Sequence, residues 1–142
     1  MTTFMSDAAT ANSKPLRVMV VEDEALVAML VEDELLDAGA TVLCIAASVA
    51  EALRVMDAAM ADGGLDACLL DMNLGGESAI PVADALARKD VPFLFMTGYD
   101  DTARQGDHAG RPTLHKPFNP RELITAMNRM VAYKAMRCGS SD

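Results

Sequence analysis

Residues 16–23 read LRVMVVED, a short apolar run that ends in two acidic residues. Apolar side chains occupy consecutive positions in this run, which indicates a β-strand covered on both faces, as strands of parallel sheets are. Four further stretches have the same character, the last of them brief, so we expect five strands. The expected strands are Leu16–Val21, Thr41–Ala46, Asp66–Leu70, Val91–Met96 and Thr113–His115.

Longer stretches with apolar residues at helical spacing separate the expected strands. This alternation is typical of a parallel sheet flanked by helices, so we expect a fold of the α/β class. In the first helical stretch, Leu26, Leu30 and Leu35 are expected to share one helical face. Gly39 follows the stretch and is expected to end the helix as a C-terminal cap.

The starts of the other expected helices carry capping signals. Ser48, with Glu51 three residues later, forms a capping box and predicts the start of the second helix. Asn119 is expected to cap the last helix, with Pro120 at its first position. A further helix is expected near Ser78–Lys89.

The chain has 142 residues, the usual size of one domain. We expect a flexible N-terminal tail over residues 1–15, the folded domain over residues 16–136 and a C-terminal tail over residues 137–142, with no appended output domain. No apolar run approaches the roughly 18 residues needed to cross a bilayer, and no export signal is visible, so we expect a cytoplasmic protein without membrane insertion. The net charge of −9 argues against direct binding of nucleic acid.

Acidic residues follow the first and third expected strands. Glu22 and Asp23 follow the first, and Asp71 follows the third. In an open parallel sheet these two strands commonly flank the point where ligands bind, so the three carboxylates are expected to converge. A hard divalent cation, Mg²⁺ or Mn²⁺, would relieve their repulsion, held by two carboxylates, a backbone carbonyl near Asn73 and water.

Two hydrogen-bond donors follow the later strands. Thr97 follows the fourth strand and offers a hydroxyl, and Lys116 follows the fifth and offers an ammonium. A carboxylate beside a bound cation can act as a nucleophile on phosphorus, and both donors would suit the oxygens of a phosphoryl group on Asp71. A cis bond between Lys116 and Pro117 would aim the ammonium inward. Each residue alone is more often a cap or a solvated turn, so it is the ordered set that indicates such a site.

This ordered set resembles that of the receiver domains of bacterial two-component response regulators, over about Leu16–Ala135. The resemblance implies a doubly wound, flavodoxin-like receiver fold with five parallel strands in the order 2-1-3-4-5. It implies that Asp71 is the phosphoacceptor and that Thr97 and Lys116 sense the phosphoryl group. It also implies a metal site made of Asp23, Asp71, the backbone carbonyl of Asn73 and, indirectly, Glu22.

Two features depart from the usual receiver pattern. The position three residues before Lys116, usually a Tyr or Phe that acts as a rotating switch, is Thr113. Residues 98–112 contain few apolar side chains, so the fourth helix is expected to be shortened or mobile. Tyr99 either packs over this segment or replaces part of the missing aromatic switch.

Residues 95–99, FMTGY, are similar to a single-domain receiver subgroup marked by a Phe-x-Thr-Gly-Tyr motif.

The resemblance implies a phosphorylatable receiver rather than an enzyme, because it would catalyse only its own phosphorylation and dephosphorylation. Asp71 would accept a phosphoryl group from a sensor histidine kinase or a phosphotransfer protein. Phosphorylation would then shift the population of conformations and promote binding to a downstream protein. Docking is expected on residues 98–112 and on the last helix near Met127 and Met130, unless these methionines are buried in the core.

Other functions remain compatible with the same acidic residues. A phosphate sink would drain a kinase without binding an effector, and fast decay of the phosphoryl group on Asp71 would favour it. A small metal-dependent phosphohydrolase would act on free metabolites, but the sequence offers no second general acid and no segment that would cap the site. A scaffold that is never phosphorylated is disfavoured, because every expected site residue is present.

Overall fold

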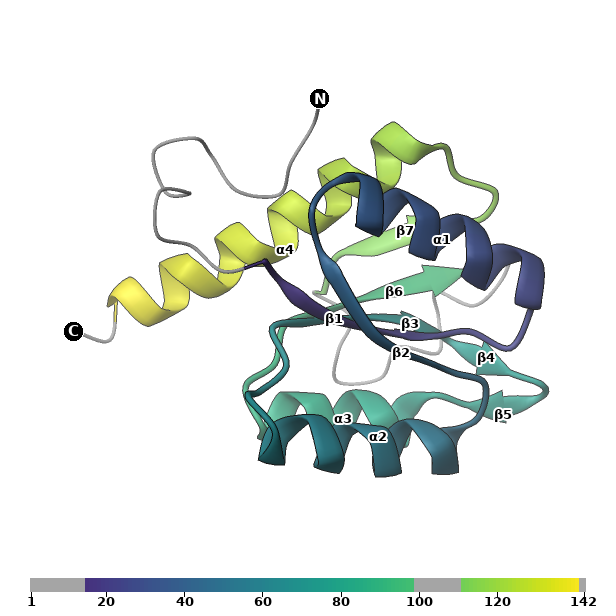
Figure 1. Ribbon diagram of the computed structural model, residues 1–142, viewed down its shortest axis with the longest axis horizontal. Coiled ribbons are helices and arrows are strands. Elements are labelled where there is room, and N and C mark those ends of the chain that lie inside the picture. The colour runs from purple at the N-terminus through teal and green to yellow at the C-terminus, as the bar shows by residue number, and fades with distance from the viewer. Residues whose placement is uncertain (1–14, 99–110, 141–142) are drawn as a thin grey trace.

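The computed structural model describes residues 15–98 and 111–140, with side chains described as far as residue 131 in the last helix (Figure 1). Its main sheet has five parallel strands in the order β2-β1-β3-β6-β7. The strands are β1 (Arg17–Val21), β2 (Thr41–Ala46), β3 (Ala67–Asp71), β6 (Phe93–Thr97) and β7 (Thr113–His115). These are the strands that the sequence predicts, and counted along the chain they lie in the expected order 2-1-3-4-5.

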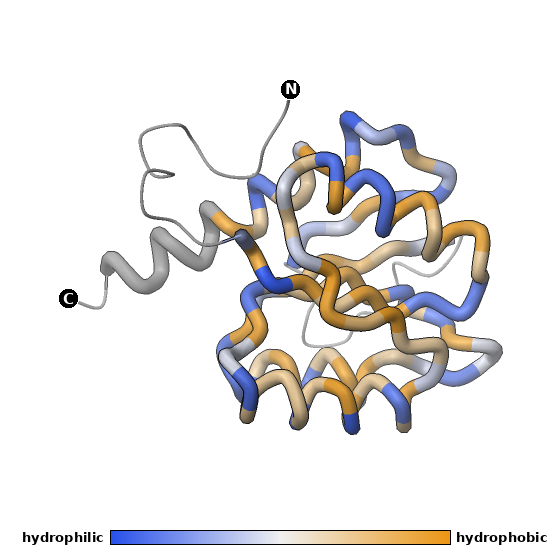
Figure 2. The backbone as a smooth tube through the Cα atoms, viewed as in Figure 1, coloured by the Kyte–Doolittle hydropathy of each residue, from blue (hydrophilic) through white to orange (hydrophobic). Residues whose placement is uncertain are grey.

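The described part of the chain forms four helices that cover both faces of the sheet (Figure 1). They are α1 (Ala25–Asp37), α2 (Val49–Ala61), α3 (Ile80–Arg88) and α4 (Pro120–Ser140). Alternate residues of β1 enter different cores: Met19 and Val21 pack with α2 and α3, whereas Val18 and Val20 pack with α1 and α4. The central strands β1, β3 and β6 are mostly apolar (Figure 2) because both faces of the sheet are buried there, whereas the edge strands β2 and β7 are only partly buried.

Helix α1 turns a different face to the core from the one predicted. Its buried residues are Ala28, Val31 and Leu35, whereas Leu26 is 76% exposed and Leu30 is 66% exposed. At about 100° per residue, Leu26 and Leu30 lie on the side of the helix opposite Leu35, so the prediction that these three leucines share one face is wrong. The predicted cap is confirmed, because Gly39 follows the helix with a φ angle of 94°.

The helix starts predicted at Ser48 and Asn119 are confirmed by hydrogen bonds between side chains and backbone N–H groups. Ser48 Oγ accepts from the backbone N–H of Glu51 at 3.1 Å, and Glu51 Oε1 accepts from the N–H of Ala47 at 2.8 Å. Asn119 Oδ1 accepts from the N–H of Glu122 at 2.8 Å, and Glu122 Oε1 accepts from the N–H of Asn119 at 2.9 Å. The second pair fixes the start of α4 close to the end of β7.

A short antiparallel hairpin, which the sequence analysis did not predict, follows β3. It consists of β4 (Asn73–Leu74) and β5 (Glu77–Ser78). Gly75 and Gly76 form the turn with φ angles of 61° and 92°, a region that glycine enters readily. Helix α3 begins just after the hairpin, at Ile80.

Helix α4 buries the methionines on which docking was predicted. Met127 is 0% exposed and Met130 is 1% exposed, and both belong to the core between the sheet and α1. Docking through these two side chains is therefore ruled out. The helix continues to Ser140, so the predicted domain boundary at residue 136 falls inside it.

Two predictions, the shortened fourth helix of the family and the role of Tyr99, fall on residues 99–110, outside the described residues. None of the described helices is long and apolar enough to span a membrane.

Candidate functional site

The three predicted acidic residues lie together at the carboxyl edge of the sheet. Glu22 follows β1, Asp71 is the last residue of β3, and these two strands are neighbours. Carboxylate oxygens of Glu22, Asp23 and Asp71 lie within 4.8 Å of one another. Glu22 is 1% exposed and Asp71 is 4% exposed, whereas Asp23 faces solvent. Two of the three charges are thus withdrawn from water, which makes them costly unless they are compensated.

Lys116 brings a compensating positive charge to the cluster. Its Nζ lies 2.7 Å from Oε1 of Glu22 and 2.8 Å from Oδ2 of Asp71. The backbone N–H of Lys116 donates to the carbonyl of Thr97 at 2.7 Å, which ties the end of β7 to the end of β6. The bond between Lys116 and Pro117 is cis. One ammonium therefore bridges carboxylates from two different strands.

The crowded charges shift pKa values in the site. Burial raises the pKa of Glu22 from 4.5 to about 7, the hydrogen bond with Lys116 opposes this rise, and Asp71 adds to it. The N–H of Glu24, which donates to Oε2 of Glu22 at 3.0 Å, also lowers the pKa. Burial alone would lower the pKa of Lys116, but its contacts with Asp71 and Glu22 outweigh burial and raise it. Burial of the carboxylate is thus the main reason why Glu22 favours its protonated form near neutral pH, and Lys116 offsets only part of this effect.

The hairpin after β3 holds the carboxylate of Asp71 from its other side. Oδ1 of Asp71 accepts from the backbone N–H of Asn73 at 3.0 Å, while Oδ2 is the atom paired with the lysine. The side-chain oxygen of Asn73 accepts from the N–H of Gly76 at 2.7 Å and closes the turn. A Cβ atom at Gly75 would lie 3.6 Å from Oδ2 of Asp23. This turn was not predicted from the sequence, although paired glycines between two short segments are a hairpin signal.

The acidic cluster opens into a cavity of about 310 Å³ that is suited to a hard cation. Asp23, Asp71 and Asn73 line this cavity together with Gly75, Gly76 and Lys116. Carboxylates and backbone carbonyls are the oxygen ligands that Mg²⁺ and similar ions prefer, and the surplus of negative charge favours a divalent ion. The residues that the sequence analysis assigned to metal binding therefore form a donor set of the right chemistry.

Thr97, the predicted hydroxyl donor, is the last residue of β6 and is fully buried. It lies one position beyond Met96, the residue that pairs with Asp71, and so stands at the same edge of the sheet. Its hydroxyl oxygen lies 3.1 Å from Nδ1 of His115, which is its partner in the register of β6 and β7. No role was predicted for His115 from the sequence. Its position could have indicated a role, because His115 ends the expected strand next to the one that ends at Thr97.

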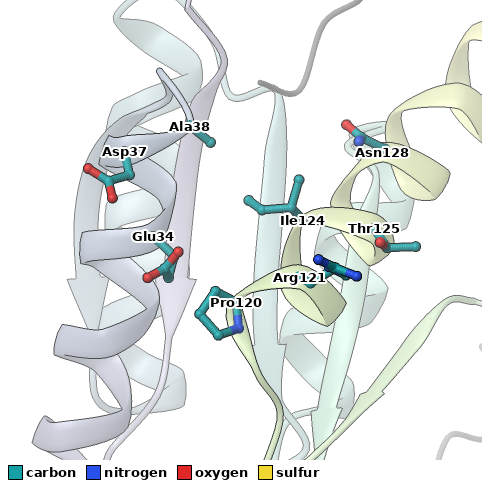
Figure 3. Close-up of a pocket in the computed structure, with 8 residues that line it drawn as sticks. All are labelled: Glu34, Asp37, Ala38, Pro120, Arg121, Ile124, Thr125 and Asn128. Atoms are coloured by element: carbon teal, nitrogen blue, oxygen red, sulfur yellow. The ribbon is translucent and has the colours of Figure 1, made fainter. Parts of the chain in front are cut away.

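Two hollows lie along the junction of α1 and α4. One of about 440 Å³ has Glu34 of α1 on one wall and Arg121 of α4 on the other, and it contains none of the acidic cluster (Figure 3). The other, of about 430 Å³, extends from Leu30 and Val27 of α1 to Lys116. We call the second hollow the α1 groove, because it connects the exposed face of α1 to the acidic site.

The chain is similar to known proteins over most of its length. The family model of the response regulator receiver domain matches residues 18–128. The solved structure of SdrG from Sphingomonas melonis Fr1 is 40% identical and covers 84% of this chain and 98% of that chain, with a TM-score of 0.73. The receiver domain of the response regulator PhyR from Erythrobacter litoralis is 28% identical and covers 84% of this chain and 92% of that chain, with a TM-score of 0.70.

Curated relatives are longer than this chain. The phosphate regulon transcriptional regulatory protein PhoB of Pseudomonas aeruginosa is 31% identical over 121 residues, which are 80% of this chain and 51% of that protein. The chain spans about half the length of the curated relatives it matches. The match over residues 18–128 agrees with the strand order and with the acidic cluster at the sheet edge, and the chain belongs to the response regulator receiver domain family, the signalling domains of two-component systems.

Proposed function

We propose that the protein is a cytoplasmic phosphorylation switch in which Asp71 accepts a phosphoryl group from a sensor histidine kinase or a phosphotransfer protein. The observation that carries this proposal is the way the Asp71 carboxylate is held inside the acidic cluster. One oxygen accepts from the N–H of Asn73 at 3.0 Å, and the other pairs with Lys116 at 2.8 Å. A carboxylate fixed at both oxygens beside an ammonium is oriented for attack on phosphorus.

The transfer step forms one bond and breaks one. An oxygen of the Asp71 carboxylate attacks the phosphorus of a phosphohistidine, and the phosphorus–nitrogen bond breaks. The imidazole nitrogen leaves with the electron pair and takes a proton from water. The oxygens of the resulting aspartyl phosphate accept hydrogen bonds from Nζ of Lys116 and from the hydroxyl of Thr97. Attack by water later releases inorganic phosphate and restores Asp71, so the protein acts only on its own phosphorylation state.

We assign a divalent cation, Mg²⁺ or Mn²⁺, to Asp23, Asp71 and the backbone carbonyl of Asn73, with Glu22 contributing indirectly. The convergence of the carboxylate oxygens within 4.8 Å supports this assignment. When bound, the cation supplies positive charge that offsets the carboxylates and the incoming phosphoryl oxygens.

Phosphorylation would redistribute the contacts of Lys116. In the resting site the ammonium is shared between Glu22 and Asp71, at 2.7 Å and 2.8 Å. After transfer, the aspartyl phosphate carries roughly −1.5 to −2 charges in place of the single negative charge of the carboxylate, and the phosphoryl oxygens then compete for the ammonium. A full change of population requires a differential of about 5.5 kcal/mol, which a dianion with ammonium, hydroxyl and cation partners is able to supply. A downstream protein that binds the second conformation would read the signal.

Helix α1 is the surface on which we propose that the phosphodonor docks. Leu26 is 76% exposed, Leu30 is 66% exposed and Met29 is 56% exposed, and the α1 groove extends from this patch to Lys116. A donor protein must bring its phosphohistidine to Asp71, so it has to cover the end of the sheet at which α1 begins. Substitution of Leu30 by Ser is expected to slow phosphorylation by a donor protein and to leave phosphorylation by a small acyl phosphate unchanged.

Intact mass spectrometry tests the proposed phosphorylation directly. The protein is incubated with a small acyl phosphate and Mg²⁺, alongside Asp71→Asn, the control Asp33→Asn on the exposed side of α1, and a sample with a metal chelator. We expect a gain of one phosphoryl mass in the native protein and the control, and none in Asp71→Asn or with chelator. An adduct that persists in Asp71→Asn would overturn the assignment. Decay of the adduct within seconds would favour the phosphate sink.

A further inference from the structure

We propose that His115 is a positioning residue that holds the hydroxyl of Thr97 in the resting site and must release it before that hydroxyl can bind a phosphoryl group on Asp71. The inference rests on the proposed phosphorylation of Asp71 and adds a regulatory contact to it. Its basis is the hydrogen bond of 3.1 Å between Thr97 Oγ1 and His115 Nδ1.

The backbone of the sheet imposes this contact. Thr97 and His115 are partners in the parallel register of β6 and β7, at the last residue of each strand. The N–H of Lys116 donates to the carbonyl of Thr97 at 2.7 Å, which locks that register at the strand ends. The two side chains therefore meet without any adjustment of the backbone.

The donors and acceptors of the two side chains indicate which atom donates in this hydrogen bond. A threonine hydroxyl has one hydrogen to donate, and a neutral imidazole nitrogen either donates or accepts. Thr97 is 0% exposed, and within residues 15–98 and 111–131 the partner of its hydroxyl is His115. If Nδ1 carried a hydrogen, the buried hydroxyl hydrogen would lack an acceptor among those residues, which is costly. In the resting site the hydroxyl donates to Nδ1, and the ring hydrogen is on Nε2.

A phosphoryl group on Asp71 competes for the same hydrogen. Its oxygens only accept hydrogen bonds, so the single hydroxyl hydrogen of Thr97 cannot serve both the phosphoryl group and His115. The imidazole is exposed and is free to turn into solvent or to exchange its hydrogen to Nδ1. In either case Nδ1 stops accepting from Thr97. The resting hydrogen bond therefore weakens phosphoryl binding by about fivefold, the factor that corresponds to the net free energy of one typical hydrogen bond.

The protonation of the ring nitrogens provides the first test. Imidazole ¹⁵N signals of the labelled full chain are recorded in the resting state, and His115→Leu identifies which of the two histidines gives each signal. We expect an unprotonated, hydrogen-bonded Nδ1, and loss of that hydrogen bond in Thr97→Val. A protonated Nδ1 in the resting protein would overturn the proposal. On addition of Mg²⁺ and beryllofluoride, an inert mimic of the phosphoryl group, the Nδ1 signal should lose the same hydrogen bond, and an unchanged signal would also overturn it.

A double-mutant cycle provides the second test. The affinity for beryllofluoride with Mg²⁺ is titrated for the native protein, His115→Leu, Thr97→Val and the double variant. We expect His115→Leu to strengthen binding about fivefold in the native background and to have no effect in the Thr97→Val background, because the competing hydroxyl is absent there. An equal gain in both backgrounds, or no gain in the first, would refute the role of His115.

The two proposals fail in distinguishable ways. If the native protein binds no beryllofluoride and takes up no phosphoryl group, the proposed function is wrong, whatever the state of His115. If the native protein binds the mimic with an unchanged Nδ1 signal, or if His115→Leu binds it no more tightly, only the role of His115 is wrong.

Discussion

In the absence of divalent metal, the native protein is expected to lose stability as the pH rises from 5 to 8. Replacement of Glu22 by Gln is expected to remove this dependence on pH. Glu22 is only 1% exposed, and this burial raises its pKa from 4.5 to about 7. Between these two values the folded protein keeps a proton that the unfolded chain releases. The folded state then binds more protons than the unfolded state, so the free energy of unfolding falls as the pH rises.

The size of this loss follows from the pKa values. The interval from 4.5 to about 7 corresponds to about 3.4 kcal/mol, because each pKa unit is worth about 1.36 kcal/mol. Of this, about 2.5 kcal/mol falls between pH 5 and pH 8, since the unfolded chain has already released part of its proton by pH 5. Glutamine does not titrate and keeps nearly the same shape, so the variant lacks this contribution.

Urea-induced unfolding followed by circular dichroism measures the effect. The native protein, Glu22→Gln and the control Glu77→Gln, an exposed residue of β5, are compared with a metal chelator at pH 5 and pH 8. The stability of Glu22→Gln relative to the native protein should rise by about 2.5 kcal/mol from pH 5 to pH 8, and the control should show no such rise. An equal difference at both pH values would refute the view that Glu22 is buried with insufficient compensating charge.

Three further predictions concern the stability of the site and of helix α4. Addition of Mg²⁺ at 100 times its dissociation constant should stabilise the native protein by about 2.7 kcal/mol in urea unfolding, and Asp23→Asn should lose most of this gain. Lys116→Met should lower the free energy of unfolding by roughly 3 kcal/mol at pH 8 without metal, because Glu22 and Asp71 lose their shared cation, and the loss should be smaller at pH 5. Asn119→Ala should cost about 1 kcal/mol in thermal unfolding through loss of the cap of α4, without changing metal affinity.

The sequence predicted the centre of the sheet well because β1, β3 and β6 are buried on both faces. Such strands need consecutive apolar residues, and this requirement is local, so these three strands were placed to within about two residues of their observed bounds. Helix caps are local in the same sense. Ser48 and Asn119 bond to backbone groups within three residues, so their roles were readable from sequence spacing.

The face of α1 was misread because a helix does not by itself indicate which side meets the core. Leucines at 26 and 30 are as apolar as Leu35, but the sheet and α4 cover only the side that carries Ala28, Val31 and Leu35. The exposed leucines became visible as a surface only once the positions of α1 and α4 on the sheet were known. The same packing buries Met127 and Met130, which confirms the alternative that they belong to the core and not to a docking surface.

The chain order of the site residues was determined by the sequence alone. Carboxylates at the ends of the first and third strands, a hydroxyl at the end of the fourth and an ammonium after the fifth must meet at one edge once the strands are parallel and adjacent. Proximity of Glu22, Asp23 and Asp71 within 4.8 Å follows from that order. The family and the type of chemistry could therefore be predicted from the sequence.

The partners of individual atoms were decided only by the tertiary structure. Lys116 bridges Glu22 and Asp71, and Thr97 meets His115, because strands far apart in sequence pair in one particular register. A slip of that register by one residue would turn these side chains to the opposite face without changing the apolar pattern. The sequence thus specifies which groups reach the edge of the sheet, and strand register and packing specify which group each of them touches.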